Sequence, residues 1–212
     1  MTRKFDIALT RSDMHSLKDG AWLNDKIIDF YLEMIVERSN NGPGPKCFAF
    51  NSHFYLQLKQ RGADEVEDWS GCTDIFHKNL IFVPVFDNNN HWTLIIVNTK
   101  TKTIKFYDSK GSRNSVAPTL VLRYLVVEHM NKKSACLDWK RYQMVPNAPT
   151  PQQMNDSDCG VFLLTLAEFM SRNRPLVFCQ NDMPYLRKRI VAEIMIGKLL
   201  TSFTCLDSEN TS

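Results

Sequence analysis

The sequence lacks the features that would assign it to several common classes of protein. Its six cysteines include no C-x-x-C pair and form no two close-spaced Cys/His pairs, so we expect no metal site. No apolar run approaches the roughly 20 residues of a membrane-spanning helix, so we expect no membrane span. A net charge of +3 is too small to favour nucleic acid as a partner.

Two further absences concern the cellular environment. The sequence has no secretory leader, and a chain of 212 residues needs no disulfide bonds to hold a core. We therefore expect reduced thiols and a location in the nucleus or the cytoplasm. The basic cluster at residues 187–189 lies within an apolar-periodic segment, so we interpret it as a solvated helix face.

The most informative stretch present is residues 151–170. A loop rich in proline and amide side chains precedes an apolar helix, and Cys159 lies where the loop becomes the helix. There Ser157 or Asp158 is available to cap the first turn, and the positive end of the helix dipole stabilises an ionised sulfur. Gly160 has no Cβ, which allows close approach to the sulfur. A lone cysteine at a helix start is more often a core residue, so the nucleophile interpretation needs support elsewhere.

Periodicity predicts the remaining elements. Thr10 and Asp13 are typical of a capping box, and Asn24 is a typical N-cap for a helix reaching about residue 38. The middle of the chain changes to strand patterns, with short links that favour an antiparallel meander. The expected strands are residues 7–9, 80–86, 91–97, 103–109 and 142–145, and the expected helices are residues 10–17, 24–38, 51–58, 116–130, 159–170 and 184–200.

These elements predict an α+β fold, with a central, mostly antiparallel sheet flanked by helices. No linker divides the chain, so we expect one catalytic domain over residues 1–212. Its core is expected over about residues 7–200, and residues 201–212 are expected to be a frayed end. Pro84 within an apolar run suggests a bulge, a strand end or an edge strand.

A cysteine nucleophile needs a base, and the base needs a group that orients it. His91 is the one histidine of five that begins a predicted strand, and Asp108 lies near the end of the next strand. Neighbouring antiparallel strands bring these two positions together, so a carboxylate can hold the imidazole tautomer. Taken singly, His91 could equally be a half-buried strand residue and Asp108 a turn cap. Their joint placement favours a triad with Cys159.

The chemistry of acyl transfer also requires hydrogen-bond donors for an oxyanion. The Cys159 backbone N–H is one candidate, and the side-chain amide of Gln152 or Gln153 is another. Trp22 and Trp92 each adjoin polar loop residues. Core packing is the default for tryptophan, but two indoles beside a nucleophile can also form a narrow channel that only a glycine backbone can thread.

Four motifs and a closing segment resemble the ubiquitin-like-protein-specific (sentrin/SUMO-specific) cysteine proteases. The resemblance covers about residues 7–200, and the order His, Asp, Cys differs from proteases whose cysteine comes first. The segments are Trp22-Leu23-Asn24-Asp25, His91-Trp92, Phe106-Tyr107-Asp108-Ser109, residues 151–160 and residues 183–189.

The resemblance implies a catalytic domain of the papain-like superfamily, which needs no cofactor. It implies His91 as general base, Asp108 as its orienting group, Cys159 as nucleophile and Gln153 as the oxyanion-hole amide. It also implies that Trp22 and Trp92 clamp the diglycine tail of a SUMO-like modifier, and that Asp25 pairs with a basic residue of that modifier. Asp156 departs from the glycine usual in the family motif, and we expect it to tune the site.

The implied function is cleavage after the C-terminal Gly-Gly of a SUMO-like modifier, both in precursors and in lysine conjugates, by a monomeric enzyme. One alternative is the same chemistry on a Nedd-like modifier or on ubiquitin. A second is a non-catalytic module that only binds SUMO-like proteins, although such a module has no need of Gln153 or the triad. An acetyltransferase on the same fold is disfavoured by the two tryptophans.

Overall fold

The computed structural model describes residues 2–87 and 91–200. Two expectations therefore lie outside the described residues: the turn at residues 88–90 and the frayed end at residues 201–212. The helices are α1 (Arg11–His15), α2 (Asp25–Asn41), α3 (Phe54–Arg61), α4 (Val116–Lys133), α5 (Cys159–Ser171) and α6 (Met183–Ile196). Short 3-10 helices cover Asp64–Ser70, Ile75–His77, Trp139–Arg141 and Gln180–Asp182. The strands are β1 (Thr2–Lys4), β2 (Ile7–Leu9), β3 (Cys47–Ala49), β4 (Leu80–Asp87), β5 (His91–Asn98), β6 (Thr103–Tyr107) and β7 (Gln143–Val145).

A five-stranded sheet in the order β3-β4-β5-β6-β7 forms the centre of the protein. Strands β4, β5 and β6 pair antiparallel, which confirms the predicted meander. The two outer strands instead pair parallel, β3 with β4 and β7 with β6, so the sheet is mixed. Each parallel pair is joined by a helical crossover, α3 in one case and α4 in the other, as a parallel connection requires.

Pro84 lies on an edge of this sheet, one of the three places predicted for it. Strand β3 pairs only with residues 80–82 of β4, so no strand covers the outer side of β4 at Pro84. The missing N–H of proline therefore costs no sheet hydrogen bond there. The inner side of β4 continues to pair with β5 as far as residue 87, which keeps the start of β5 aligned.

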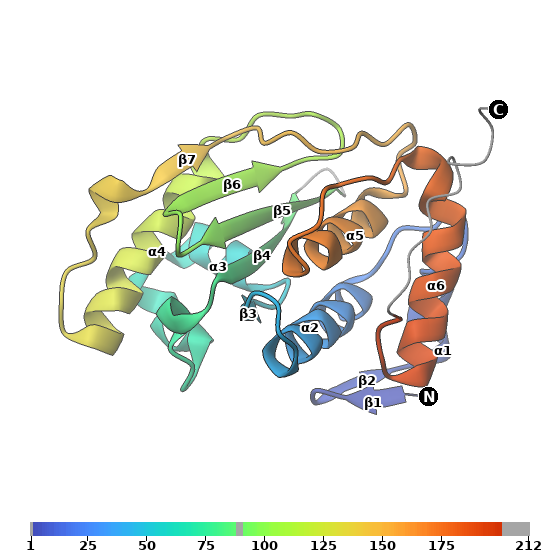
Figure 1. Ribbon diagram of the computed structural model, residues 1–212, viewed down its shortest axis with the longest axis horizontal. Helices are drawn as coiled ribbons and strands as arrows, with labels where there is room; N and C mark the ends of the chain where they lie inside the picture. The colour runs from blue at the N-terminus through green and yellow to red at the C-terminus, as the bar shows by residue number, and fades with distance from the viewer. Residues whose placement is uncertain (1, 88–90, 201–212) are drawn as a thin grey trace.

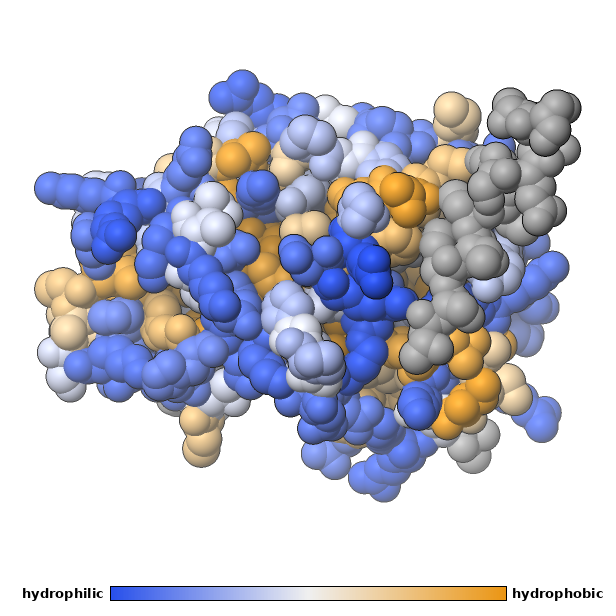
Figure 2. All heavy atoms as spheres, in the orientation of Figure 1, coloured by the Kyte–Doolittle hydropathy of each residue, from blue (hydrophilic) through white to orange (hydrophobic). Residues whose placement is uncertain are grey.

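Helices cover both faces of the sheet (Figure 1). On β5, Trp92, Leu94 and Ile96 belong to the core shared with α2, α5 and α6. Ile95 and Val97 alternate with them and belong to the core shared with α3 and α4. This period of two buries β5 on both faces and fixes its register. The polar side chains are left to the surface, and the face drawn in Figure 2 is mostly hydrophilic with separate apolar areas.

The helix starts follow the predicted capping chemistry. Thr10 and Asp13 form the expected capping box at α1, and the Asn24 side chain accepts a hydrogen bond from the N–H of Ile27 at α2. The ends differ: α2 continues through Asn41, and α6 stops at Ile196, where Gly197 adopts a left-handed conformation with φ of 73°. Glycine takes that conformation without strain, and this explains why the helix stops before Leu200.

The arrangement brings three chain segments together at one end of the inner strands of the sheet. The start of β5 and the end of β6 meet there because the two strands are antiparallel. Helix α5 packs against β5 and α2, so its N-terminus reaches the same end (Figure 1). Among the described residues, no helix is long and apolar enough to cross a membrane.

Candidate active site

Cys159 is the first residue of α5, and its side chain is 1% exposed. Asp158 occupies the N-cap position, but its side chain makes no capping hydrogen bond, so the prediction that Asp158 caps the first turn is wrong. Its carboxylate is engaged instead by Arg187, Asn155 and Gln180. The Asp158 side chain therefore does not occupy the first-turn amides of α5, which helix geometry leaves without intrahelical partners.

Gly160 serves a different contact from the one expected. A Cβ at this position would lie 2.8 Å from the Cβ and from Cδ1 of Leu23. Glycine therefore lets the segment that carries Trp22 pack directly on the start of α5. The close approach that the sequence predicted at Gly160 is an internal packing contact, and it fixes Leu23 next to the cysteine.

His91 and Asp108 meet where β5 begins and β6 ends. The Nε2 atom of His91 lies 2.6 Å from Oδ1 of Asp108, and the Asp108 side chain is almost fully buried. Asp108 also accepts hydrogen bonds from the N–H groups of Lys110 and Ser112. Burial favours the neutral acid, but these hydrogen bonds from His91, Ser112 and Lys110 outweigh it, so the pKa of Asp108 is lowered.

The other ring nitrogen of His91, Nδ1, is the one not used by Asp108. Nδ1 is buried and has no partner with hydrogen-bond geometry among the described residues. Burial alone lowers the pKa of His91, but the interactions with Asp108 and with Cys159 oppose it and raise the pKa from 6.5 to about 9. Nε2–H is therefore held by Asp108 while Nδ1 remains available to exchange a proton, which is the arrangement that a general base requires.

The raised pKa of His91 predicts the alkaline limit of activity. The imidazolium is retained up to about pH 9 and is lost as the pH rises through that value. Since the imidazolium stabilises an ionised sulfur and protonates the leaving group, we expect kcat/KM to fall on the alkaline side near pH 9. A pH profile of kcat/KM measures this limb. An alkaline limb near pH 6.5, the ordinary value for histidine, would contradict the ion-pair geometry.

The two glutamines of the loop have different surroundings. Gln153 is half-buried: its Oε1 accepts from the Ser109 hydroxyl at 2.5 Å, and its backbone N–H donates to the carbonyl of Ser109 at 2.8 Å. One side-chain N–H of Gln153 donates to the carbonyl of Asn155, which leaves the second for a ligand. Gln152 is exposed and donates to the carbonyls of Thr150 and Asp108. Ser109 therefore orients the amide of Gln153, a contact that no sequence motif predicted.

This difference gives a test that separates the two side chains. Loss of one oxyanion donor costs about 10²–10³ in kcat. We expect Gln153→Ala to lose that much with little change in KM. The neighbouring Gln152→Ala is the matched control and should stay within about threefold of the parent, because its amide donates to the backbone carbonyls of Thr150 and Asp108. Steady-state kinetics on one substrate compares them, and the reverse ranking would contradict the assignment.

Trp22, Trp92 and Asp25 line one groove, together with Phe86 and His53. The groove has a volume of about 330 Å³. Trp92 is only 4% exposed, and its indole N–H donates to the carbonyl of Leu23, whereas Trp22 is 50% exposed. Asp25 lies at the rim, with its Oδ2 3.5 Å from Nε2 of His53. The two indoles therefore contribute unequally, one as a buried wall and the other as an exposed one.

Asp156, the departure from the family motif, makes one contact through its side chain and one through its backbone. Its carboxylate pairs with Lys110 at 2.7 Å and is exposed. Its backbone carbonyl accepts a hydrogen bond from the indole N–H of Trp22, also at 2.7 Å. Because that contact uses the backbone, glycine would serve it equally well.

A second hollow adjoins the histidine. It has a volume of about 300 Å³, and its lining includes His91 and Asp108 with the basic residues Lys59, Lys110 and Arg113. A group released next to His91 has room there. Among residues 2–87 and 91–200, no cluster of three or more Cys, His, Asp or Glu side chains has the arrangement of a metal site.

Sequence reasoning missed one residue that this site depends on. Arg187 was predicted to lie on a solvated helix face, but it is 1% exposed and its guanidinium contacts Asp158, next to the cysteine. That prediction is wrong, and it is wrong for Arg189 as well, which is also buried and pairs with Glu193. Only Lys188 of the three is exposed. Arg187 lies four residues after Met183 and three before Ile190, both buried, and this spacing was the available signal.

Comparison with known proteins gives one family. Residues 21–199 match the model of the Ulp1 protease family, C-terminal catalytic domain. Mouse sentrin-specific protease 2 is 36% identical over 203 residues, which are 94% of this chain and 34% of the relative. A sentrin-specific protease of Caenorhabditis elegans is 37% identical over 199 residues, 93% of this chain and 28% of the relative. The chain thus spans about a third of the length of these relatives.

Solved structures agree in fold. The crystal structure of the C-terminal Ulp1 protease domain in complex with Smt3, the yeast ortholog of SUMO, superposes with a TM-score of 0.80. The sequences are 31% identical, and the match covers 92% of this chain and 86% of that one. The catalytic domain of the Ulp1-like SUMO protease of Chaetomium thermophilum gives a TM-score of 0.77 at 26% identity, over 94% and 82% of the two chains.

Proposed function

This chain belongs to the Ulp1 protease family, and from that premise we propose that it is a SUMO-specific cysteine protease. It cleaves after the C-terminal Gly-Gly of a SUMO-like modifier, both in precursors and in lysine conjugates. The observation that carries the proposal is the pairing of His91 with Asp108 and the interaction of His91 with Cys159. Trp92, next to His91, lines both the groove that contains Trp22 and the pocket that contains Cys159. A solved relative was captured in complex with a SUMO ortholog, which supports the choice of modifier.

The proposed first half-reaction acylates the enzyme. Nδ1 of His91 holds the proton that the Cys159 thiol has given up, and the ionised sulfur attacks the carbonyl carbon of the terminal glycine. The resulting oxyanion accepts hydrogen bonds from the Cys159 backbone N–H and from Nε2 of Gln153. As the intermediate collapses, the C–N bond breaks and His91 gives its proton to the departing amine. The hollow beside His91 gives the departing group room.

The second half-reaction releases the modifier. His91 takes a proton from water, and the hydroxide attacks the thioester carbon. The C–S bond breaks, the modifier leaves with a C-terminal carboxylate, and Cys159 regains its proton. Asp108 stays ionised throughout, and its carboxylate stabilises the imidazolium each time that it forms. No cofactor takes part in either step.

The shape of the groove supports a proposal for the last two residues of the substrate. Trp92 is a buried wall and Trp22 an exposed one, so a tail lying between them has room for a backbone without side chains. Asp25 lines the same groove, and we propose that it pairs with a basic residue of the modifier. We further propose a single catalytic domain acting as a monomer in the nucleus or cytoplasm, without a nucleic-acid partner.

The test compares modifiers that end in Gly-Gly with modifiers that end in Gly-Ala, each linked to a fluorophore. We expect the Gly-Ala tail to be cleaved at least about 10²-fold more slowly, because one methyl displaces the scissile carbonyl by about 1 Å from the sulfur. Trp92→Ala should narrow this ratio while lowering the rate, and a thermal melt separates that effect from unfolding. Equal cleavage of both tails by the parent enzyme would contradict the channel and return both tryptophans to ordinary packing.

The alternative with the same chemistry is a Nedd-like modifier or ubiquitin. Selectivity among modifiers depends on the surface around Asp25 rather than on the triad. A module that only binds SUMO-like proteins would bind the modifier without releasing the fluorophore. The same fluorophore assay therefore distinguishes an enzyme from a binding module.

A further inference from the structure

Arg187 of α6 is a buried cation that contacts both the segment leading into Trp22 and the loop leading into Cys159. Its side chain is 1% exposed and is among the largest fully buried side chains of the described residues. Burying a guanidinium is costly unless its donors are used, so a buried arginine marks a place where several acceptors converge. The acceptors around Arg187 come from two segments far apart in the sequence.

The first segment is the loop that leads into Cys159. Nε and Nη2 of Arg187 both donate to Oδ1 of Asp158, at 2.9 Å and 2.6 Å. Nη2 also donates to the carbonyl of Ser157 at 3.0 Å. These two residues immediately precede the nucleophile, so the guanidinium fixes the point at which the loop becomes α5.

The second segment leads into Trp22. Nη1 of Arg187 donates to the carbonyls of Lys18 at 2.9 Å and Ser16 at 3.3 Å. Nη2 donates to the carbonyl of Ala21 at 2.7 Å. Ala21 is directly bonded to Trp22, just as Asp158 is directly bonded to Cys159. One guanidinium thus contacts the residue before the exposed wall of the groove and the residue before the sulfur.

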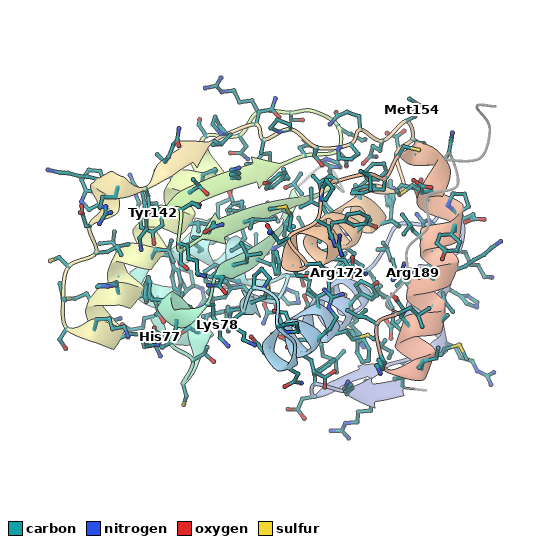
Figure 3. All side chains as sticks on the ribbon, viewed as in Figure 1. His77, Lys78, Tyr142, Met154, Arg172 and Arg189 are labelled. Atoms are coloured by element: carbon teal, nitrogen blue, oxygen red, sulfur yellow. The ribbon has the colours of Figure 1, made fainter. Side chains whose placement is uncertain are left out.

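Asp158 extends this link along the loop. Its second oxygen, Oδ2, accepts from Asn155 at 2.7 Å and from Gln180 at 2.8 Å. The carbonyl oxygen of the Gln180 side chain in turn accepts from the N–H of Met154 at 2.7 Å. Met154 itself is exposed, and Figure 3 shows it near the start of α6. The loop that follows Gln153 is therefore held at Met154 by Gln180 of the 3-10 helix before α6, and at Asp158 by Arg187 of α6.

From these contacts we propose that Arg187 is a positioning residue that sets the spacing between the Trp22 wall of the groove and Cys159. The inference rests on the proposed function, because the spacing matters only if a tail lies in the groove. Two other contacts join the Trp22 segment to the segment around Cys159: the indole of Trp22 donates to the carbonyl of Asp156, and Leu23 packs on Gly160. Arg187 is the charged centre of this junction, and it reaches both sides at once.

Lysine cannot replace this geometry. A guanidinium presents five donors in a planar fork, whereas an ammonium presents three donors from a single point. An ammonium that pairs with Asp158 would leave carbonyls of the Trp22 segment without a donor. The segment would then shift relative to the sulfur, and a displacement of about 1 Å at a reacting centre can cost 10²-fold in rate.

The experiment compares Arg187→Lys with Arg189→Lys. Arg189 is a matched control, because it is also buried on α6 and also pairs with a carboxylate, Glu193, but it donates to the carbonyl of Leu200 at the far end of the helix. The readouts are kcat and KM on a SUMO–fluorophore substrate, the Gly-Gly to Gly-Ala rate ratio, the melting temperature, and the rate at which iodoacetamide alkylates Cys159. Iodoacetamide needs no tail in the groove.

We expect Arg187→Lys to lower kcat about 10²-fold with KM within about threefold, and to narrow the Gly-Gly to Gly-Ala ratio. The alkylation rate should stay within about threefold, because His91 and Asp108 are untouched. Arg189→Lys should melt lower by a similar amount while keeping the parent's rate ratio. If Arg187→Lys keeps the parent kcat and ratio, or if both variants lose activity in parallel with their folded fraction, the proposal is overturned.

Two controls keep the result interpretable. Should Arg187→Lys not fold at the assay temperature, Asp158→Asn removes the ionic partner from the other side at nearly constant volume, and the same kinetic pattern is expected of it. Retention of the parent kcat and rate ratio by Asp158→Asn would equally overturn the proposal. A parent enzyme that cleaves no Gly-Gly substrate would instead reject the proposed function.

Discussion

Replacing Cys159 by serine is expected to abolish cleavage of a Gly-Gly modifier, with a loss in kcat of roughly 10⁴-fold or more. The change substitutes one atom by another of similar size within a fully packed helix start, so the fold and the groove should persist. A hydroxyl is far less acidic than a thiol, and His91 positioned for sulfur does not ionise it. Release of a C-terminal fluorophore measures the loss.

The control for this variant is binding. Cys159→Ser should bind the modifier with a Kd within about threefold of the parent, because the groove and Asp25 are unchanged. A serine variant that also fails to bind would indicate a folding defect, which a thermal melt detects. Residual turnover within about tenfold of the parent would contradict the assignment of the nucleophile.

The second large effect is expected for Asp108→Asn, which should lower kcat by at most about 10⁴-fold, by analogy with a serine triad. The carboxylate accepts from His91 and from the backbone of Lys110 and Ser112, and an amide can serve these only in part. An amide also favours the wrong tautomer of His91. The loss should be smaller than the limit, because a thiol needs less help than a hydroxyl.

Asp108 also ties down the turn that follows β6, so the variant needs a structural control. Asp74→Asn is suitable, because Asp74 also accepts a backbone hydrogen bond in a turn and lies away from the groove. Its melting temperature should fall comparably while its kcat stays near the parent's. Activity of Asp108→Asn within a few-fold of the parent would mean that Asp108 is only a turn cap.

The sequence predicted those parts of the fold that local chemistry determines. The caps at Thr10 and Asn24 form as expected, since a side chain three residues from its partner amide needs no tertiary context. The short links between β4, β5 and β6 determined an antiparallel meander, which placed His91 next to Asp108. The parallel attachment of β3 and β7 was not predictable in this way, because crossover strands find their partners only through the packing of α3 and α4.

The sequence-based predictions are wrong where a polar side chain contacts a residue that is distant in the sequence. Asp158 looks like a helix cap, and Arg187 looks like a surface charge, because a local interpretation sees only neighbours along the chain. Asp158 and Arg187 pair with each other although they are 29 residues apart in the sequence. Arg187 also donates to backbone carbonyls near residue 20. Gly160 likewise looks available to a ligand until Leu23 is placed against it. Such contacts depend on how α5, α6 and the Trp22 segment come together.

The spacing of apolar residues on α6 carried a signal that charge obscured. Leu186, Ile190 and Ile194 are buried and lie on one stripe of the helix. Arg187 belongs to the same stripe, so periodicity alone would have buried it. The expectation that charged residues are solvated overrode that pattern. A charged residue within an apolar stripe deserves to be matched with distant carboxylates before it is assigned to the surface.

The most direct test of the account is covalent capture with modifiers that carry a C-terminal electrophile after Gly-Gly. Three are compared in one reaction series: SUMO, a Nedd-like modifier and ubiquitin, with the modified cysteine located by peptide mass spectrometry. We expect SUMO to react fastest and its adduct to lie on Cys159 alone of the six cysteines. An adduct on another cysteine, or faster capture of ubiquitin than of SUMO, would contradict the account.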